Sequence, residues 1–296
     1  MKLVRYNLSK SSTERLGIQL EDGILEMDRL ADHLNCPIPL TMRKLLKDHD
    51  KGIEQLMAVL DRAKELHFDM SQYLLSESDF RYLPVIGDPE KILCVGLNYV
   101  DHVKATGADV PVNPVFFNKF PNALAAHKQV IPLPVISQKV DYEAELVIMI
   151  GDYANSVSES EAKKAVLGYT VGNDISERQY QFQSSQWMIG KTFDFFGPVG
   201  PALVTKDEIE DVNNLSIHTK RNNELVQNSS TSNMIFSVER IVSEASQYMT
   251  LKPGDLIFTG TPSGVIVEQK DPDWLKSKDL LEVTIDQIGT LCNQMI

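Results

Sequence analysis

The sequence has few cysteines, no long apolar run and no excess of basic residues, and each absence excludes a class of protein. Cysteine occurs three times in 296 residues, without a CxxC pair. A disulfide framework and a cysteine zinc site are therefore excluded, and a reducing compartment is favoured. The longest apolar run, LVIMI at 146–150, is far too short for a membrane span, and the first ten residues lack the apolar stretch of a signal peptide. We therefore expect a soluble, cytoplasmic protein without a membrane partner.

Basic residues are outnumbered, with 29 Lys and Arg against 41 Asp and Glu, and the formal net charge is −12. This charge argues against nucleic acid as a partner, because phosphate backbones require a basic surface. The GxGxxG, Walker, HExxH and GxSxG patterns are also absent. Their absence argues against a dinucleotide site, a P-loop, a zincin and a serine esterase, and we predict no organic cofactor.

The patterns that are present divide the chain into two parts. Residues 1–72 are expected to form a small N-terminal α+β domain, in which LVRYNL and LGIQL are typical of strands and Asp22-Gly23 of a hairpin turn. Apolar residues from Leu45 to Leu66 then recur at helical spacing. A Pro- and Gly-rich cluster indicates a linker, placed at residues 73–87, before a larger domain at 88–296.

The larger part is dominated by strand patterns. These patterns occupy residues 91–98, 140–151, 169–174, 255–260 and 280–286. A hairpin is predicted to turn at Asn222-Asn223, Ser158 and Glu161 match a capping box, and 237–249 has the spacing of an amphipathic helix. Strands and helices do not alternate regularly enough for a doubly wound sheet, so a β-rich α+β fold is predicted.

Acidic residues alternate in the segment VDYEAELVIMI. In one continuous strand, Asp141, Glu143 and Glu145 would share a face, and the residues between them would face a core. Successive glutamates on such a face lie about 6.5–7 Å apart and repel one another. A hard divalent cation with oxygen ligands would remove this repulsion. A solvated strand face that carries surface acids is the alternative.

Other residues are candidates for a functional site only in combination with Glu143 and Glu145. Asp174 closes the strand YTVGND and could supply a third ligand, although a turn residue or an N-cap would have the same pattern. His102 and Lys191 are each also typical of a surface residue. The turn that contains Thr261, GTPSG, could present amides and hydroxyls to an anion or be a plain turn.

Taken together, the ordered motifs of residues 88–296 resemble the fumarylacetoacetate hydrolase family, closest to its acylpyruvase-like branch with a small N-terminal domain. The motifs are KILCVGLNYVDH, PVFFNKF, VDYEAELVIMIG, GYTVGNDISER, QWMIGKTFDFFGPVGPALVT, NMIFSVERIVSEASQYMTLKPGDLIFTGTPSGV and VTIDQIGTL. The resemblance implies a mixed-sheet roll around a metal site, and a homodimer. It also implies a small keto acid as substrate.

The resemblance also assigns roles to individual residues. The implied ligands of Mg²⁺ or Mn²⁺ are Glu143, Glu145 and Asp174. His102 would lie on a lid helix as the general base, and Lys191 would stabilise a developing enolate. The implied substrate contacts are Arg178, Gln181, Thr261 and Lys119.

The chain departs from the family pattern in the acid–base half of the site. The family lid reads H-x-x-E, whereas Ala105 follows His102 by three residues. Asn122-Ala123, with Ala125-Ala126-His127 after it, replaces a Ser-Ser pair and a glycine, and Ile266 follows Val265 where a glycine is usual. The orienting acid is therefore missing locally, and a glutamate from elsewhere in the chain or His127 could compensate.

These observations leave two functional hypotheses. The first is a metal-dependent enzyme that cleaves or decarboxylates a 2-keto or 1,3-diketo acid, with enol–keto isomerisation as an alternative that needs no activated water. The second is a catalytically weakened protein that binds a keto acid in a regulatory role. The retained ligand set and Lys191 favour the enzyme.

Overall fold

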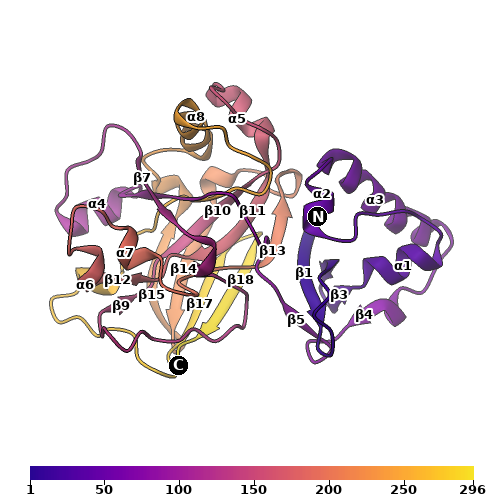
Figure 1. Ribbon diagram of the computed structural model, residues 1–296, viewed down its shortest axis with the longest axis horizontal. Helices are drawn as coiled ribbons and strands as arrows, with labels where there is room; N and C mark the ends of the chain where they lie inside the picture. The colour runs from indigo at the N-terminus through magenta and orange to yellow at the C-terminus, as the bar shows by residue number, and fades with distance from the viewer.

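The computed structural model describes residues 1–296 and shows an N-terminal unit beside a larger body (Figure 1). The N-terminal unit contains five strands and three helices. The strands are β1 (Lys2–Leu8), β2 (Arg15–Leu20), β3 (Gly23–Leu25), β4 (Leu74–Leu75) and β5 (Phe80–Tyr82). The helices are α1 (Met27–His33), α2 (Met42–Leu45) and α3 (His49–Glu65), followed by the 3-10 turn η1 (Ser71–Tyr73). Leu20 pairs with Gly23, so the predicted hairpin is present, but its turn residues are Glu21 and Asp22 rather than Asp22 and Gly23.

A single twelve-stranded sheet runs through both parts of the molecule. Its order is β4-β3-β2-β1-β13-β11-β10-β16-β6-β7, with β5 beside β1 and β8 beside β13. The strands of the larger body in this sheet are β6 (Ile92–Gly96), β7 (Val115–Lys119), β8 (Leu124–Ala125), β10 (Ala144–Ile150), β11 (Val166–Asn173), β13 (Gly197–Thr205) and β16 (Leu256–Phe258). The sheet is mixed, because β16 pairs in parallel with β6 and β13 with β8.

A second, antiparallel sheet packs against the first and closes the roll. Its order is β15-β14-β17-β18, formed by β14 (Ser216–Arg221), β15 (Glu224–Ser230), β17 (Leu280–Ile285) and β18 (Gly289–Gln294). Leu146, Ile148 and Val171 from the first sheet share one core with Ile217 and Val283 from the second. The predicted α+β class is confirmed, and the predicted hairpin turns at Asn222 and Asn223, both left-handed.

Helices and short turns complete the body. The helices are α4 (Val100–Thr106), α5 (Glu159–Ala165), α6 (Arg178–Gln181), α7 (Met188–Lys191) and α8 (Val238–Tyr248). The 3-10 turns are η2 (Pro121–Ala123), η3 (Lys206–Glu208), η4 (Val212–Asn214), η5 (Thr231–Asn233) and η6 (Ile266–Glu268). The pair α5 and α8 lies at the top in Figure 1. The capping box of Ser158 and Glu161 is present at α5, and Ser237 caps the predicted amphipathic helix α8.

The acidic segment is not one continuous strand, which corrects the sequence prediction. Residues 140–141 form β9, which pairs with β12 (Ser176–Glu177), and β10 begins only at Ala144. Asp141 therefore lies outside the strand that follows Glu143. Both faces of β10 are buried, because the twelve-stranded sheet is covered on its two sides in this region. Burial on both sides rules out the solvated strand face.

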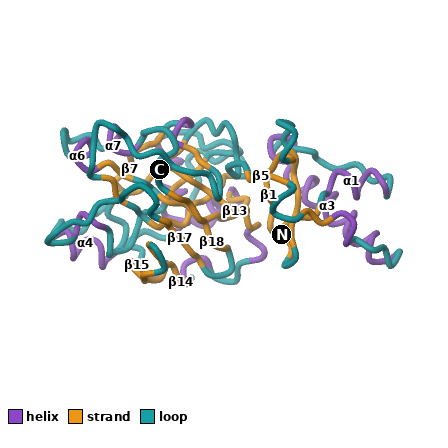
Figure 2. Tube along the Cα trace, turned by 90° about the horizontal axis from the view of Figure 1, so that it is seen from below, coloured by secondary structure: helices purple, strands orange, loops and turns teal.

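The two parts of the chain share packing as well as hydrogen bonds. Strand β1 pairs with β13, and Leu3 and Leu16 belong to the same buried cluster as Val147 and Phe258. The view from below shows the N-terminal unit extending the body lengthwise, with β1 nearest to β13 (Figure 2). The division into residues 1–72, 73–87 and 88–296 stays a prediction, and the sheet is continuous across it.

Candidate active site and metal centre

A cavity of about 470 Å³ lies beneath helix α4, between α6, α7 and the turn η6. Its polar part is lined by His102, Glu143, Glu145, Arg178, Gln181, Lys191, Thr261 and Glu268. Its apolar wall is formed by Leu97, Ala105, Phe117, Phe182 and Trp187, among others. Seven of the nine residues that the sequence singled out therefore lie around one cavity, and the other two, Asp174 and Lys119, lie directly behind it. A larger hollow, of about 890 Å³, lies between the two parts of the chain and contains none of these residues.

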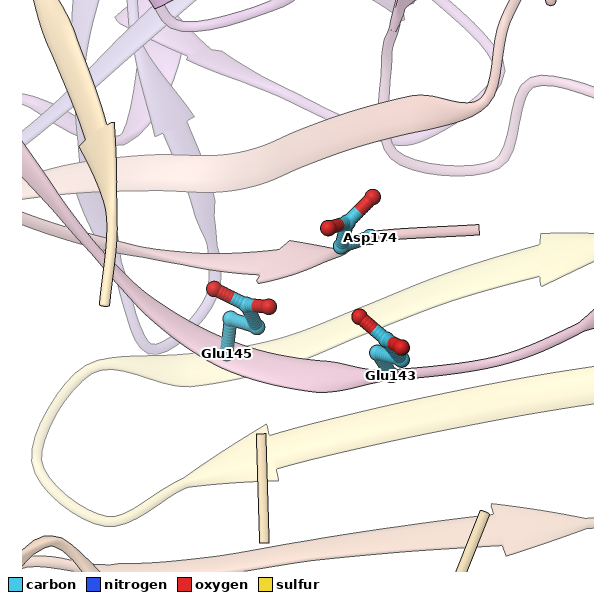
Figure 3. A group of neighbouring side chains, drawn as sticks. All are labelled: Glu143, Glu145 and Asp174. Carbon is cyan, nitrogen blue, oxygen red and sulfur yellow. The ribbon is translucent and has the colours of Figure 1, made fainter. Parts of the chain in front are cut away.

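The predicted ligands Glu143, Glu145 and Asp174 converge at the base of this cavity. Each offers a carboxylate oxygen, and these oxygens all lie within 4.8 Å of one another. Glu143 and Glu145 project from the start of β10, and Asp174 comes directly after β11, the antiparallel neighbour of β10 (Figure 3). The side chains are 5%, 1% and 0% exposed, so solubility does not explain their presence.

The three carboxylates differ in how their charge is balanced. Burial raises the pKa of Glu143, but Lys191 and Arg178 outweigh this effect and hold it below its ordinary value. Glu145 has no ion pair, and its Oε2 accepts a hydrogen bond from Gly260 N at 2.7 Å. Burial, together with Asp174 and Glu143, raises the pKa of Glu145 well above its ordinary value. No side chain therefore forms an ion pair with an ionised Glu145.

This arrangement fits a hard divalent cation. The site contains four buried carboxylates but only three buried cationic side chains. The carboxylates belong to Asp141, Glu143, Glu145 and Asp174, and the cations to Lys119, Lys191 and Arg178. A cation with oxygen ligands would compensate the remaining charge at the point where the three ligand oxygens converge. Carboxylate-only ligation is typical of Mg²⁺ or Mn²⁺ rather than of zinc.

The two lysines hold Asp174 from opposite sides. Lys191 Nζ donates to Glu143 Oε2 at 2.7 Å and to Asp174 Oδ2 at 2.9 Å. Burial opposes its charge, but Asp174 and Glu143 raise the pKa of Lys191 above its ordinary value, so it stays an ammonium. Lys119 Nζ lies 2.5 Å from Asp174 Oδ1 and also donates to the carbonyls of Ile175, Lys191 and Phe196. Lys119 does not line the cavity, and its placement supports Asp174 rather than a substrate contact.

The orienting acid that the lid lacks at position 105 comes from a distant segment. His102 Nδ1 lies 2.5 Å from Glu268 Oε1, and Glu268 Oε2 accepts from Gly264 N at 2.7 Å. A carboxylate only accepts hydrogen bonds, so in the neutral imidazole tautomer that fits this pair Nδ1 carries the proton and Nε2 is the acceptor. The sequence did not identify Glu268, because 166 residues separate it from His102 and no local spacing relates them.

The remaining predicted residues also have defined positions. Arg178 Nη1 reaches Glu143 Oε1 at 2.7 Å and Gln181 Oε1 at 2.8 Å. Thr261 Oγ1 accepts from Gln227 Nε2 at 3.0 Å, so Gln227 is a second supporting residue that the sequence did not reveal. His127 lies away from the cavity, where its Nδ1 accepts from Cys292 N at 3.1 Å, and this position contradicts a role for it in proton transfer at the site.

Comparisons with known proteins agree with this geometry. The family described as fumarylacetoacetate (FAA) hydrolase C-terminal matches residues 91–296. The chain belongs to the fumarylacetoacetate hydrolase family. Oxaloacetate tautomerase fahd2, mitochondrial, from Xenopus laevis is 40% identical over 300 residues, which cover 100% of this chain and 90% of that protein. The predicted family and its fold are thus confirmed.

Solved structures of family members superpose over the whole chain. The 2-hydroxyhepta-2,4-diene-1,7-dioate isomerase from Mycobacterium marinum has a TM-score of 0.72 and 31% identity, and covers 100% of this chain and 98% of its own. Maleylpyruvate hydrolase from Sphingobium sp. SYK-6, in complex with manganese(II) ion and pyruvate, has a TM-score of 0.76 and 27% identity, with 100% and 99% covered. The family relatives thus include a tautomerase, an isomerase and a hydrolase.

Proposed function

We propose that this chain interconverts the enol and keto forms of oxaloacetate in a reaction that requires Mg²⁺ or Mn²⁺. The observation that carries the proposal is the His102–Glu268 pair, which faces the same cavity as Glu143, Glu145 and Lys191. The 40% identity over almost the full length of a protein named as an oxaloacetate tautomerase supports this choice among the family reactions.

The reaction moves one proton between C3 and the oxygen on C2. In the enol-to-keto direction, the hydroxyl loses its proton, its electron pair forms the C2 carbonyl, and the C2–C3 double bond takes up a proton at C3. A divalent cation bound by Glu143, Glu145 and Asp174 would supply Lewis-acid stabilisation of the negative charge on the C2 oxygen. No water molecule is consumed, and no carbon–carbon bond breaks.

The side chains of the site divide the remaining tasks. His102 Nε2 is the acceptor of the neutral imidazole, so we assign both proton transfers to it: it takes the proton that the hydroxyl loses and delivers it to C3. Lys191 remains a cation and therefore stabilises negative oxygen rather than accepting a proton. Arg178, Gln181 and Thr261 are assigned to the substrate carboxylates, whose negative charge complements the guanidinium.

Hydrolysis of a 1,3-diketo acid is the second candidate. It is favoured by the apolar wall of Phe117, Phe182 and Trp187, which leaves room for an acyl group beyond the polar part. Decarboxylation of oxaloacetate uses the same enolate stabilisation and is tested beside it. The hypothesis of a weakened binding protein was based on the missing lid acid. It is no longer needed, because Glu268 supplies a carboxylate to His102.

The experiment measures three reactions of the same purified protein after chelation and reloading with Mg²⁺ or Mn²⁺. Enol decay is followed by ultraviolet absorbance, decarboxylation by pyruvate release, and hydrolysis by loss of an acylpyruvate. We expect tautomerisation to exceed the buffer rate only with metal, and Glu268→Gln to lower its kcat roughly 10- to 1,000-fold while cation binding is retained. A metal-loaded protein that leaves enol decay at the buffer rate would refute the proposal, and acylpyruvate loss would then identify the hydrolase.

Location and assembly are two separate proposals. No helix is both long and apolar enough to cross a bilayer. The relative from Xenopus laevis is named as mitochondrial, and we keep the cytoplasm as the proposed location of this chain until fractionation tests it. We also propose a homodimer, and analytical ultracentrifugation of the purified protein would measure its oligomeric state.

A further inference from the structure

Asp141 is fully buried and makes more hydrogen bonds than any of the three predicted ligands. Its Oδ1 accepts from Tyr142 N and Ile266 N, both at 2.8 Å. Its Oδ2 accepts from Val267 N at 3.0 Å and from Arg178 Nε at 2.9 Å, and lies 2.8 Å from Arg178 Nη2. Asp141 does not line the cavity and is not one of the converging carboxylates. Both carboxylate oxygens of Asp141 thus already accept hydrogen bonds from groups of the protein.

The partners of Asp141 belong to two different sides of the site. Arg178 extends from Asp141 into the cavity, where its Nη1 reaches Glu143 and Gln181. Ile266 and Val267 begin the turn η6, whose last residue is Glu268, the acid that holds His102. A single carboxylate therefore fixes the guanidinium that would bind substrate and the segment that orients the general base.

We propose that Asp141 is a positioning residue, which sets the distance between Arg178 and the His102–Glu268 pair without touching the substrate. The rate test of this role rests on the proposed function, whereas the geometry does not. Both carboxylate oxygens are needed, because donors approach each of them. An amide in place of the carboxylate turns an NH₂ group against N–H donors on one side. Whichever side this is, the turn η6 loses one of its two hydrogen bonds, because Ile266 and Val267 donate to different oxygens of Asp141.

Asp141→Asn in the Mg²⁺-loaded full chain tests the proposal, with Asp255→Asn as the matched control. Asp255 is likewise buried and accepts from two backbone N–H groups, of Lys91 and Lys252, and from Lys91 Nζ, but it lies away from the cavity. We expect Asp141→Asn to lower kcat roughly 10- to 100-fold, with a raised KM, and Asp255→Asn to leave both nearly unchanged in the folded protein. Equal losses of stability with kcat and KM retained in both variants would reduce Asp141 to a structural role.

A second measurement does not depend on activity. The His102 Nδ1–H proton, held by Glu268, should give a downfield NMR resonance, assigned by its absence in His102→Asn. We expect this resonance to move or disappear in Asp141→Asn and to persist in Asp255→Asn. An unchanged resonance in Asp141→Asn would overturn the proposal. If the wild type proves inactive on oxaloacetate, this spectrum still decides the role of Asp141.

A charge-conserving variant covers the case in which Asp141→Asn does not fold. Asp141→Glu keeps an ion pair for Arg178, so no buried cation is left unpaired, but it lengthens the side chain by one methylene. We expect a folded protein whose kcat is lowered about tenfold or more, because the two sides of the site are displaced relative to each other. Wild-type kcat in Asp141→Glu would show that charge alone matters, and would refute positioning.

Discussion

Glu143 and Glu145 flank Ala144, the first residue of β10, but different groups bind their carboxylates. Glu143 pairs with Arg178 at 2.7 Å and with Lys191 at 2.7 Å, whereas Glu145 receives only the backbone N–H of Gly260. Removing one partner from a buried ion pair leaves a buried charge behind, which typically costs about 3–5 kcal/mol. Removing a carboxylate that has no ion-pair partner leaves no unpaired charge behind.

Substitution of each glutamate by glutamine should therefore separate metal binding from stability. We expect Glu145→Gln to bind Mn²⁺ at least about tenfold more weakly, while the free energy of unfolding of the metal-free protein changes by no more than about 1 kcal/mol, since the amide oxygen still accepts from Gly260. We expect Glu143→Gln to lose both metal affinity and about 3 kcal/mol of stability. Mn²⁺ titration calorimetry and urea unfolding give the two quantities. Wild-type Mn²⁺ affinity in Glu145→Gln would exclude this residue as a ligand.

Single residues were predictable from sequence where their chemistry is local. Two-residue alternation marked Glu143 and Glu145 as candidates, a strand end marked Asp174, and only the resemblance to the family predicted all three as metal ligands. Glu268 and Gln227 could not be assigned, because they act through tertiary contacts with His102 and Thr261. The alternation rule could not place Asp141, because it assumes a continuous strand and the strand is interrupted between β9 and β10.

The lid helix α4 is attached to the body mainly at its first turn. Asn98, just before it, exchanges hydrogen bonds with Phe236 and also donates to Thr259 O. Asp101 Oδ2 accepts from Ser229 Oγ at 3.0 Å and from Ser263 Oγ at 3.3 Å, and its Oδ1 accepts from His102 N at 3.0 Å. The helix ends at Gly107, whose φ of 68° is left-handed. Asp101 therefore ties the backbone of His102, the proposed general base, to strand β15 of the second sheet and to the GTPSG turn.

Loss of this attachment should loosen the lid without changing the metal centre. We expect Asp101→Asn to lower kcat about 3- to 10-fold and to speed hydrogen exchange in residues 99–107, because one or two hydrogen bonds to a charged acceptor are weakened. Mn²⁺ affinity should stay at the wild-type value. Asp109→Asn, at an exposed position just past the helix, is the control and should change neither quantity. Unaltered exchange in Asp101→Asn would place the restraint on α4 elsewhere.

Strand β13 is one of the strands that sequence patterns failed to identify. Its residues, GPVGPALVT, include two prolines and two glycines, which usually mark a loop. The strand nevertheless lies between β1 and β11 in the sheet. Its register with β11 shifts between Tyr169 and Val171, opposite Pro201, so the missing N–H of this proline falls in an irregular part of the ladder. Tertiary pairing therefore makes this Pro- and Gly-rich segment a strand, and local sequence rules could not predict it.

On the scale of the whole molecule, β13 joins the N-terminal unit to the body that carries the site. Its edge receives β1, and the turn region beside it brings His127 against the ring of Tyr82, with 4.7 Å between ring centroids. His127 also accepts from the backbone of Cys292 on β18. The histidine thus links strand β5 of the N-terminal unit to the second sheet, and its neutral form is the one that accepts.

This contact should make the stability of the folded chain depend on pH. Burial lowers the pKa of His127 from 6.5 to about 4, and the charge of Lys128 adds to this effect. Below about pH 6.5 the unfolded chain binds a proton that the folded chain does not, so the free energy of unfolding falls as the pH decreases toward 4 and levels off below it. The loss has a ceiling of about 3 kcal/mol, from about 1.4 kcal/mol for each unit of pKa difference.

Urea unfolding of His127→Gln against wild type, between about pH 7 and about pH 4.5, isolates this contribution from the carboxylates that titrate in the same range. Glutamine keeps an acceptor for Cys292 N but does not titrate, so the stability advantage of wild type should be largest near pH 7 and shrink on acidification. His67→Asn controls for a histidine as such, because His67 is exposed and its left-handed φ of 50° suits asparagine. Parallel pH curves for wild type and His127→Gln would show that the junction between the two parts is insensitive to this proton.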